Sequence, residues 1–221
     1  MKILQITNYF YPAISFGGPV QYTYNLSKYL TKLGHEVTVY TTNALELHTN
    51  KKISNKRKKI NGIDVHYLPF IIRPYGYFIV PEIISKILKN VKLFDIVHLH
   101  EYRTFQNMIF YLFKKDIPYV VHLHGELLYK KEKLDVFLLR RTYENLFTNK
   151  FLNCASRIFA LTKYEFSQLV KLGYEKRKIS IVPNAVSPDR FIITPHKNTF
   201  KKYFNIENNR IILYVGRIYK Y

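Results

Sequence analysis

Two short apolar runs of the sequence each carry a pair of histidines, His98 and His100 in the first and His122 and His124 in the second. A two-residue spacing places both imidazoles of a pair on one face of a strand. Imidazole titrates near neutral pH, so it can share a proton or a hydrogen bond with a substrate hydroxyl, and it also binds metal ions. The pairs lack a matching set of carboxylates or thiolates, so we expect no metal site here.

His100 and His124 are expected to end their strands. In an open parallel sheet, ligands bind beyond the carboxyl ends of the strands. We therefore expect His124, which is followed by Gly125 and Glu126, to meet a substrate. The earlier histidine of each pair is expected to be a core residue whose hydrogen bonds are satisfied.

The beginning of the chain predicts the frame that holds these side chains. An apolar stretch at 3–6 is typical of a buried strand, and the run from 20 to 33 is typical of an amphipathic helix. The stripe of that helix consists of Val20, Tyr24, Ser27, Leu30 and Leu33. A second strand is expected at 36–42, and a strand–helix–strand unit of this kind has parallel strands.

Between the first strand and its helix lie Gly17 and Gly18. These two glycines either make a tight turn into the helix or let a substrate anion approach the backbone and the helix N-terminus. Both interpretations stay open. A G-x-G-x-x-G fingerprint does not follow this strand, which disfavours a nicotinamide enzyme.

The rest of the chain alternates in the same way. Strands are expected at 63–67, 94–100, 118–123, 157–161 and 179–182, and helices at 81–93, 105–115, 129–155 and 163–172. This alternation predicts an α/β fold with a doubly wound, mostly parallel, Rossmann-like sheet. Thr162 is expected to cap the last of these helices, and Gly173 to end it.

Two connecting segments have unusual compositions. The stretch 43–59 is rich in lysine and predicts a solvated loop, with anion binding as a second interpretation. An Asn61-Gly62 turn follows it. The stretch 69–81 is dense in aromatic residues, and it is either a loop packed under a helix or an exposed apolar patch for a lipid or a partner.

The chain has 221 residues and a formal net charge of +20. Such a charge attracts nucleotide phosphates, nucleic acids or anionic lipid surfaces without choosing among them. Cys154 is the single cysteine, which suits a reducing compartment. Neither a signal-peptide pattern nor a run of about eighteen apolar residues is present. We therefore expect a cytoplasmic protein, and peripheral contact with the inner face of the membrane stays open.

Two boundaries are predicted near the end of the chain. The composition turns polar at 187–209, which is typical of a linker, and 210–217 looks like a new buried strand. The sequence therefore predicts a domain at 1–186, a linker, and the truncated start of a second domain at 210–221.

Seven motifs in a particular order support a family resemblance. They are Gly17-Gly18, LTKLGHEVTVYTT at 30–42, FDIVHLH at 94–100, VVHLHGE at 120–126, ALTKYE at 160–165, IVPNAV at 181–186 and LYVGRI at 213–218. This series resembles the family-4 (group 1) glycosyltransferases, which have the two-domain GT-B architecture. The resemblance covers nearly the whole chain and implies that it is the N-terminal half of a GT-B fold with the first strand of the other half.

The resemblance implies transfer of a sugar from a nucleotide-sugar to an acceptor hydroxyl with retention at the anomeric carbon, without a bound metal or other cofactor. It places the acceptor on the N-terminal domain and the nucleotide on the C-terminal one. The implied catalytic residue is His124, close to the transferred sugar, and Arg217 would contact the donor diphosphate. The implied cleft residues are Gly17, Gly18, His100, Gly125, Glu126 and Asn184.

The sequence departs from the family pattern in three ways. Ala185 stands where the family usually has glycine, and the lysine expected shortly after Arg217 and the acidic pair of the second domain are missing. We therefore expect this chain alone to be inactive. Its acceptor is expected in cell-surface glycan or glycolipid synthesis. The alternative function is a non-catalytic basic module that binds anionic membrane or nucleic acid, and the lack of a nucleic-acid readout motif disfavours the latter.

Overall fold

The computed structural model describes residues 1–125, 141–184, 196, 198–206 and 210–215. The chain forms two compact units, Met1–Ala185 and Val186–Tyr221. The first unit holds the sheet and the two histidine pairs, and it is described first.

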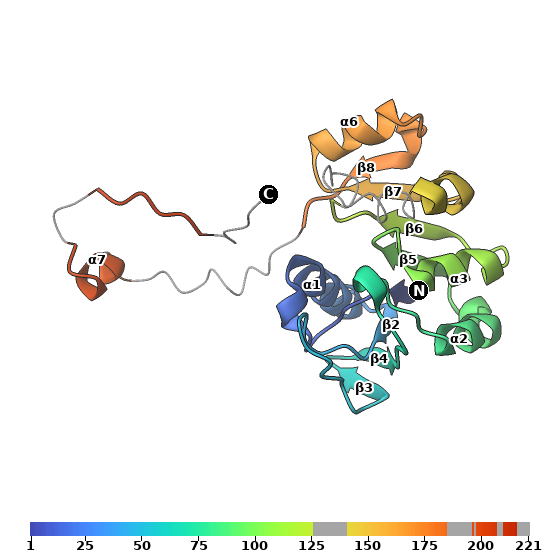
Figure 1. Ribbon diagram of the computed structural model, residues 1–221, viewed down its shortest axis with the longest axis horizontal. Coiled ribbons are helices and arrows are strands. Elements are labelled where there is room, and N and C mark those ends of the chain that lie inside the picture. The colour runs from blue at the N-terminus through green and yellow to red at the C-terminus, as the bar shows by residue number, and fades with distance from the viewer. Residues whose placement is uncertain (126–140, 185–195, 197, 207–209, 216–221) are drawn as a thin grey trace. The chain divides into compact units, whose positions relative to one another are not determined.

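Eight strands form one sheet in the order β3-β4-β2-β1-β5-β6-β7-β8 (Figure 1). The strands are β1 Lys2–Ile6, β2 Glu36–Thr42, β3 Arg57–Ile60, β4 Ile63–Leu68, β5 Ile96–His100, β6 Tyr119–His122, β7 Arg157–Ala160 and β8 Ile179–Ile181. Every pairing is parallel except that of β3 with β4. The predicted doubly wound, mostly parallel α/β sheet is confirmed.

Helices connect the parallel strands. The α-helices are α1 Gly18–Lys32, α2 Glu82–Asn90, α3 Phe105–Phe113, α5 Asn149–Asn153 and α6 Lys163–Lys171. Short 3₁₀ turns lie at Ile14–Phe16, Pro74–Gly76, Val91–Leu93 and Lys176–Lys178, and a π-helical stretch, Glu144–Thr148, leads into α5. The expected helix at 129–155 is thus observed in its second part, and its first part lies outside the described residues.

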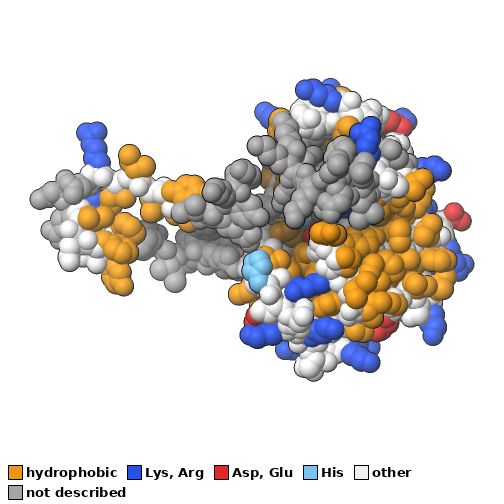
Figure 2. Space-filling model, in the orientation of Figure 1, with side chains coloured by type: hydrophobic (Ala, Val, Ile, Leu, Met, Phe, Trp, Pro, Cys, Tyr) orange, Lys and Arg blue, Asp and Glu red, His pale blue; other side chains and the backbone are white. Residues whose placement is uncertain are grey.

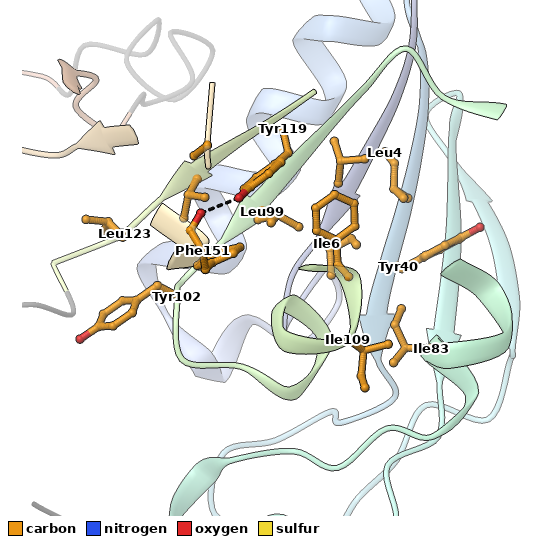
Figure 3. Close-up of a cluster of buried hydrophobic side chains, with 14 of the residues drawn as sticks. Leu4, Ile6, Tyr40, Ile83, Leu99, Tyr102, Ile109, Tyr119, Leu123 and Phe151 are labelled. Atoms are coloured by element: carbon orange, nitrogen blue, oxygen red, sulfur yellow. Dashed lines mark hydrogen bonds between the residues drawn. The ribbon is translucent and has the colours of Figure 1, made fainter. Parts of the chain in front are cut away.

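The two faces of the sheet bury different side chains. On one face, Val39 and Val65 pack with Leu30 of α1. On the other face, the strands pack against α2, α3 and α5, and Figure 3 shows Leu99 with Ile109 and Phe151 in this layer. The hydroxyl of Tyr119 donates a hydrogen bond to the carbonyl of Phe151, which ties β6 to α5. A tyrosine hydroxyl inside an apolar layer needs a hydrogen-bond partner of this kind.

The buried face of helix α1 differs from the apolar stripe that the sequence predicts. Val20 and Ser27 are buried as expected, but Leu33 is 74% exposed. Tyr22 and Thr23, which the stripe omitted, are buried instead. The expected stripe was wrong in this part because α1 crosses from the aliphatic strands β2 and β4 to the polar surface of β5 and β6, so polar residues also face the sheet.

The basic segment before the Asn61-Gly62 turn is partly a strand, so the expected loop was wrong at β3. This edge strand pairs with β4, and Arg57 donates two hydrogen bonds to the carboxylate of Asp64, at 2.8 and 2.7 Å. Lysines on an edge strand discourage pairing with another chain. In the aromatic segment Phe78 is buried and Tyr75 is 75% exposed, so one part packs into the core and another part is exposed.

Apolar side chains also remain on the surface of the first unit. Figure 2 shows hydrophobic side chains gathered in the region of α2 and α3. The exposed apolar residues of these helices are Leu88, Leu112 and Phe113. In the part of the chain that the structure describes, no helix combines the length and apolarity needed to cross a bilayer.

The second unit contains the short helix α7, Thr199–Tyr203. Residues 210–215 are not in a strand, and Ile212 and Val215 are exposed. The strand predicted from 210 onwards is therefore not observed over its described residues. A strand is stable only when its backbone groups pair with neighbouring strands, and residues 210–215 pair with none of the described strands.

The buried layer predicts a difference between two leucines. We expect Leu99→Ala to lower the free energy of unfolding by about 2–5 kcal/mol, because a cavity remains in a closed core. Leu112→Ala is the matched control, since Leu112 is 60% exposed, and it should change the free energy by no more than about 0.5 kcal/mol. Urea unfolding followed by circular dichroism measures both, and equal losses would contradict the packing described.

Candidate functional site

The four histidines of the two pairs form one cluster at the carboxyl edge of β5 and β6. His100 pairs in register with His122, and both pairs lie on the face of the sheet that α1 covers. The rings stack, with centroids 4.3 Å apart for His98–His100, 4.2 Å for His122–His124 and 5.3 Å for His100–His124. The prediction that each pair shares one face is confirmed.

Hydrogen bonds join this cluster to β1. Nε2 of His100 lies 2.9 Å from Oε1 of Gln5, a fully buried residue one position before the end of β1. Nδ1 of His100 lies 3.0 Å from Nε2 of His124. Gln5, His100 and His124 therefore form a continuous chain of polar contacts from the centre of the sheet to its edge.

Helix α1 closes the cluster from above. The ring of Tyr22 meets three imidazoles edge-on, with centroid distances of 4.6 Å to His122, 5.2 Å to His124 and 6.0 Å to His100. Burial raises the pKa of the Tyr22 phenol to about 12. Thr23 Oγ1 lies 3.5 Å from Nδ1 of His100 and donates its hydrogen bond to the carbonyl of Pro19. The helix thus excludes water from the rings.

Burial keeps the imidazoles neutral. It lowers the pKa of His98 to about 3 and that of His124 to about 4, and it also lowers the pKa values of His100 and His122. The neighbouring imidazoles add to this shift, because two adjacent positive charges repel each other. Asn184 lies near His124 and works against the shift. Neutral imidazoles are therefore the state of the site at physiological pH.

The two inner histidines, His98 and His122, are buried as expected, but their hydrogen bonding differs from the expectation. Among the described residues, Nε2 of His98 and both ring nitrogens of His122 lack a partner in hydrogen-bond geometry. The backbone of Val182 comes near His122 without meeting that geometry and slightly raises its pKa. The expectation of satisfied core histidines is therefore not met at these three nitrogens. The two rings stack on each other, and both meet the ring of Phe159 edge-on.

A buried carboxylate holds the turn that follows β6. His124 and Gly125 both have positive φ, at 55° and 84°, and glycine adopts that conformation without strain. The N–H of Gly125 donates to Oε1 of Glu165 at 3.0 Å, and the N–H of Leu161 donates to Oε2 at 2.7 Å. Glu165 is fully buried, and burial raises its pKa while these two bonds lower it.

Helix α6 supplies this carboxylate in its first turn. Thr162 accepts a hydrogen bond from the N–H of Glu165 at 3.1 Å, so the expected cap is confirmed. In a capping box the acidic residue returns to the backbone of the cap residue. Here the carboxylate of Glu165 instead accepts hydrogen bonds from Leu161, the residue before the cap, and from Gly125 in the turn after β6. The start of α6 is thereby tied to the residue after His124.

The end of β5 is held by a second set of contacts. Nδ2 of Asn8, just after β1, donates to Oε2 of Glu101 at 2.6 Å. The side-chain amide of Asn107 donates to the carbonyls of His100 and Glu101 at 3.2 and 2.9 Å. Thr104 caps α3. The carboxyl ends of β1 and β5 are therefore fixed beside the histidines.

The two glycines lie at the same edge of the sheet, between β1 and α1. Gly17 has φ 85° and ψ −139°, a conformation that favours glycine, so the tight-turn interpretation applies to it. Gly18 begins the helix with Pro19 in its first turn, and a Cβ placed on Gly18 would meet nothing within 4 Å. Space therefore remains beside the backbone at Gly18, as a bound anion would require.

The structure brings together a large part of the predicted site. His100, His124, Gly125 and Asn184 adjoin one another, and Gly17 and Gly18 lie at the same edge. Glu126 and Arg217 lie outside the described residues. Among the described residues, no three His, Cys, Asp or Glu side chains are placed to hold a metal ion.

Three residues of this site were not singled out from the sequence. The sequence feature that could have indicated Gln5 is its polar side chain inside a buried strand. No sequence feature indicated Tyr22, because it lies off the apolar stripe of its helix. Glu165 stands three residues after Thr162, the spacing of a capping box, which indicates a helix start and not a link to Gly125.

Comparisons with known proteins identify the family. The model of Glycosyltransferase Family 4 matches residues 16–190. The match covers more than half of the chain, so the chain belongs to this family. A phosphatidylinositol N-acetylglucosaminyltransferase component from Arabidopsis thaliana is 33% identical over 107 residues, which cover 46% of this chain and 22% of that protein.

Solved structures of low sequence identity share the fold. HepE from Anabaena, in complex with UDP-glucose, is 15% identical with a TM-score of 0.59, over 95% of this chain and 51% of that one. Sucrose-phosphate synthase from Thermosynechococcus elongatus is 13% identical with a TM-score of 0.60, over 92% and 52%. The sheet is therefore the Rossmann-like sheet of a GT-B glycosyltransferase, and the chain spans about half the length of these structures.

The buried histidines predict a loss of stability in mild acid. Their pKa values are lowered in the folded state, so the unfolded chain binds more protons once the pH falls below about 6.5. Each imidazole then removes roughly 1.4 kcal/mol of stability per pH unit, until the pH reaches its folded pKa. Burial raises the pKa of Glu165, which acts in the opposite direction. We expect a large decrease in the free energy of unfolding between pH 7.5 and 5.

Urea unfolding at several pH values measures this dependence. His98→Phe should reduce the slope by about one proton, because one of the four buried imidazoles is replaced by a ring that does not titrate. A free energy of unfolding that stays constant from pH 7.5 to 5 would show that the imidazoles are not buried as described.

The carboxylate of Glu165 predicts a second local effect. Glu165→Ala leaves two partly buried N–H groups without acceptors and should cost about 2–4 kcal/mol of stability. It should also speed hydrogen exchange at the amide of Gly125. Glu175→Ala is the control, since this exposed residue pairs with Arg177 at the surface, and its loss should cost less than about 1 kcal/mol. Unchanged exchange at Gly125 would contradict the tie between α6 and the turn.

Proposed function

We propose that this chain is the acceptor-side part of a retaining glycosyltransferase that moves a sugar from a nucleotide-sugar to an acceptor hydroxyl. The observation that carries the proposal is His124, a neutral imidazole at the carboxyl edge of the sheet, within the residues that match the family. The family membership and the fold shared with HepE, whose structure contains UDP-glucose, support it.

In this reaction the bond between the anomeric carbon and the donor diphosphate breaks, and a bond to the acceptor oxygen forms. Negative charge develops on the departing diphosphate as its bond breaks, and the acceptor hydroxyl gives its proton to an oxygen of that diphosphate. Hydrogen-bond donors and cations near the leaving group therefore stabilise the transition state most. The N-terminal turn of α1 after Gly17 and Gly18 offers free N–H groups, and we assign Arg217 to the diphosphate.

His124 is assigned to the transferred sugar. Because burial lowers its pKa to about 4, it meets the sugar as a neutral imidazole, which forms hydrogen bonds with hydroxyl groups. Gly125, Glu126, His100 and Asn184 are assigned to the surrounding cleft. We assign no metal to the reaction.

The acceptor is proposed to belong to cell-surface glycan or glycolipid synthesis. The Arabidopsis relative is named as part of a phosphatidylinositol N-acetylglucosaminyltransferase. This name supports a lipid-linked acceptor. The net charge of +20 favours an acceptor that carries phosphate or lies at an anionic surface. Peripheral contact with the inner face of a membrane would follow from such an acceptor.

We further propose that 1–186 is the acceptor domain, that 187–209 is a linker and that 210–221 begins the nucleotide-binding domain. The chain alone is then inactive, because a retaining GT-B enzyme holds the nucleotide on its second domain. Incubation of the purified chain with labelled nucleotide-sugars and lipid acceptors tests this, and measurable transfer would contradict it.

The role of His124 predicts a kinetic effect in a protein that joins this chain to a nucleotide-binding domain. His124→Ala should lower kcat/KM by about 10²-fold or more, because a positioned hydrogen bond to the reacting sugar is lost. His48→Ala is the control, since His48 lies exposed in a loop, and it should leave kcat/KM unchanged. Unchanged turnover of His124→Ala would remove this imidazole from the site.

A further inference from the structure

We propose that Gln5 is a positioning residue that sets the tautomers of His100 and His124, so that Nδ1 of His124 remains the hydrogen-bond acceptor of the site. This inference rests on the proposed function for its use, because an acceptor nitrogen selects groups that donate, such as a sugar hydroxyl. Its test concerns the imidazoles themselves and does not require activity.

The first step is the contact between Gln5 and His100. Gln5 is fully buried, and its Oε1 lies 2.9 Å from Nε2 of His100. A carbonyl oxygen only accepts hydrogen bonds. Nε2 of His100 must therefore carry the hydrogen.

The second step passes through His100 to His124. His100 is fully buried between strands and helix α1, and burial holds its pKa well below the ordinary value. It is therefore neutral with a single N–H, so its Nδ1 has a lone pair. That atom lies 3.0 Å from Nε2 of His124, which must then donate. The hydrogen of His124 is thereby fixed on Nε2.

The third step concerns the remaining nitrogen of His124. The ring is neutral and its hydrogen is on Nε2, so Nδ1 has a lone pair. Nδ1 is buried, and within the described part of the chain no residue meets it in full hydrogen-bond geometry, although the side chain of Asn184 lies close enough to His124 to raise its pKa. An unused buried acceptor costs free energy, and a hydroxyl that donates to it would remove this cost.

The direction of the whole chain depends on one amide. If the side-chain NH₂ of Gln5 faced His100, each imidazole would carry its hydrogen on Nδ1, and His124 would offer a donor in place of an acceptor. The carbonyl oxygen of Gln5 faces His100, and its Nε2 has no partner among the described residues. A buried residue of β1 thus decides what the edge of β6 can bind.

Nuclear magnetic resonance of the chain labelled with ¹⁵N-histidine tests the inference. Two-bond ¹H–¹⁵N correlations distinguish the Nε2–H and Nδ1–H tautomers. At pH 7.5 we expect the Nε2–H tautomer for both His100 and His124. The Nδ1–H tautomer at either residue would overturn the proposal, and this test needs no variant.

A pair of variants tests the role of Gln5. Gln5→Met removes the acceptor at similar volume and should convert His100 and His124 to mixtures of tautomers. Gln106→Met is the matched control, because Gln106 is also buried and neither of its side-chain atoms has a hydrogen-bond partner among the described residues. It should leave both tautomers unchanged. Equal effects of the two variants, or unchanged tautomers in Gln5→Met, would overturn the role of Gln5.

Activity separates this inference from the proposed function. In a protein with the nucleotide-binding domain, Gln5→Met should lower kcat/KM at least tenfold more than Gln106→Met does. If the expected tautomers are found in a protein that transfers no sugar, the proposed function fails and the tautomer assignment stands. If sugar is transferred with the Nδ1–H tautomers, the tautomer assignment fails and the function stands.

Discussion

Desolvation of four imidazoles on one face of a parallel sheet is the constraint on which the rest of this structure depends. Buried charge is costly, so the rings stay neutral, stack on one another and meet the ring of Tyr22 edge-on. A neutral ring has one donor and one acceptor, and its partners decide which nitrogen is which. Gln5 and His100 are those partners, and the tight cover of α1 keeps water from replacing them.

The carboxyl edge of the sheet is held from both sides of the cluster. Glu165 ties the start of α6 to Gly125, and Asn107 ties α3 to the end of β5. Each tie uses a buried side chain to satisfy backbone groups that a strand end or a turn leaves unpaired. Backbone positions beside His124 are therefore set by neighbouring helices, which lets a loop residue be placed as firmly as a strand residue. Family membership and the shared GT-B fold support the proposal that this edge meets a substrate.

Much of the fold could be predicted because its signals are local. Apolar runs of strand length, caps such as Thr162 and the glycines at helix ends indicated the alternation of strands and helices. The errors arose where a segment's surroundings decide its state. The basic residues of β3 form a strand because β4 lies beside them, and residues 210–215 form none because no described strand pairs with them.

The sequence by itself determined the alternating α/β pattern, the pairing of histidines on single strands and the resemblance to a glycosyltransferase family. Only the tertiary structure decided that both pairs meet, that Gln5 joins them and that Glu165 reaches Gly125. The reason is that periodicity acts over a few residues, whereas the contact of Gln5 with His100 depends on strand order and register across 95 residues of chain. Register and crossover packing are properties of the whole sheet, so they follow from the assembled fold.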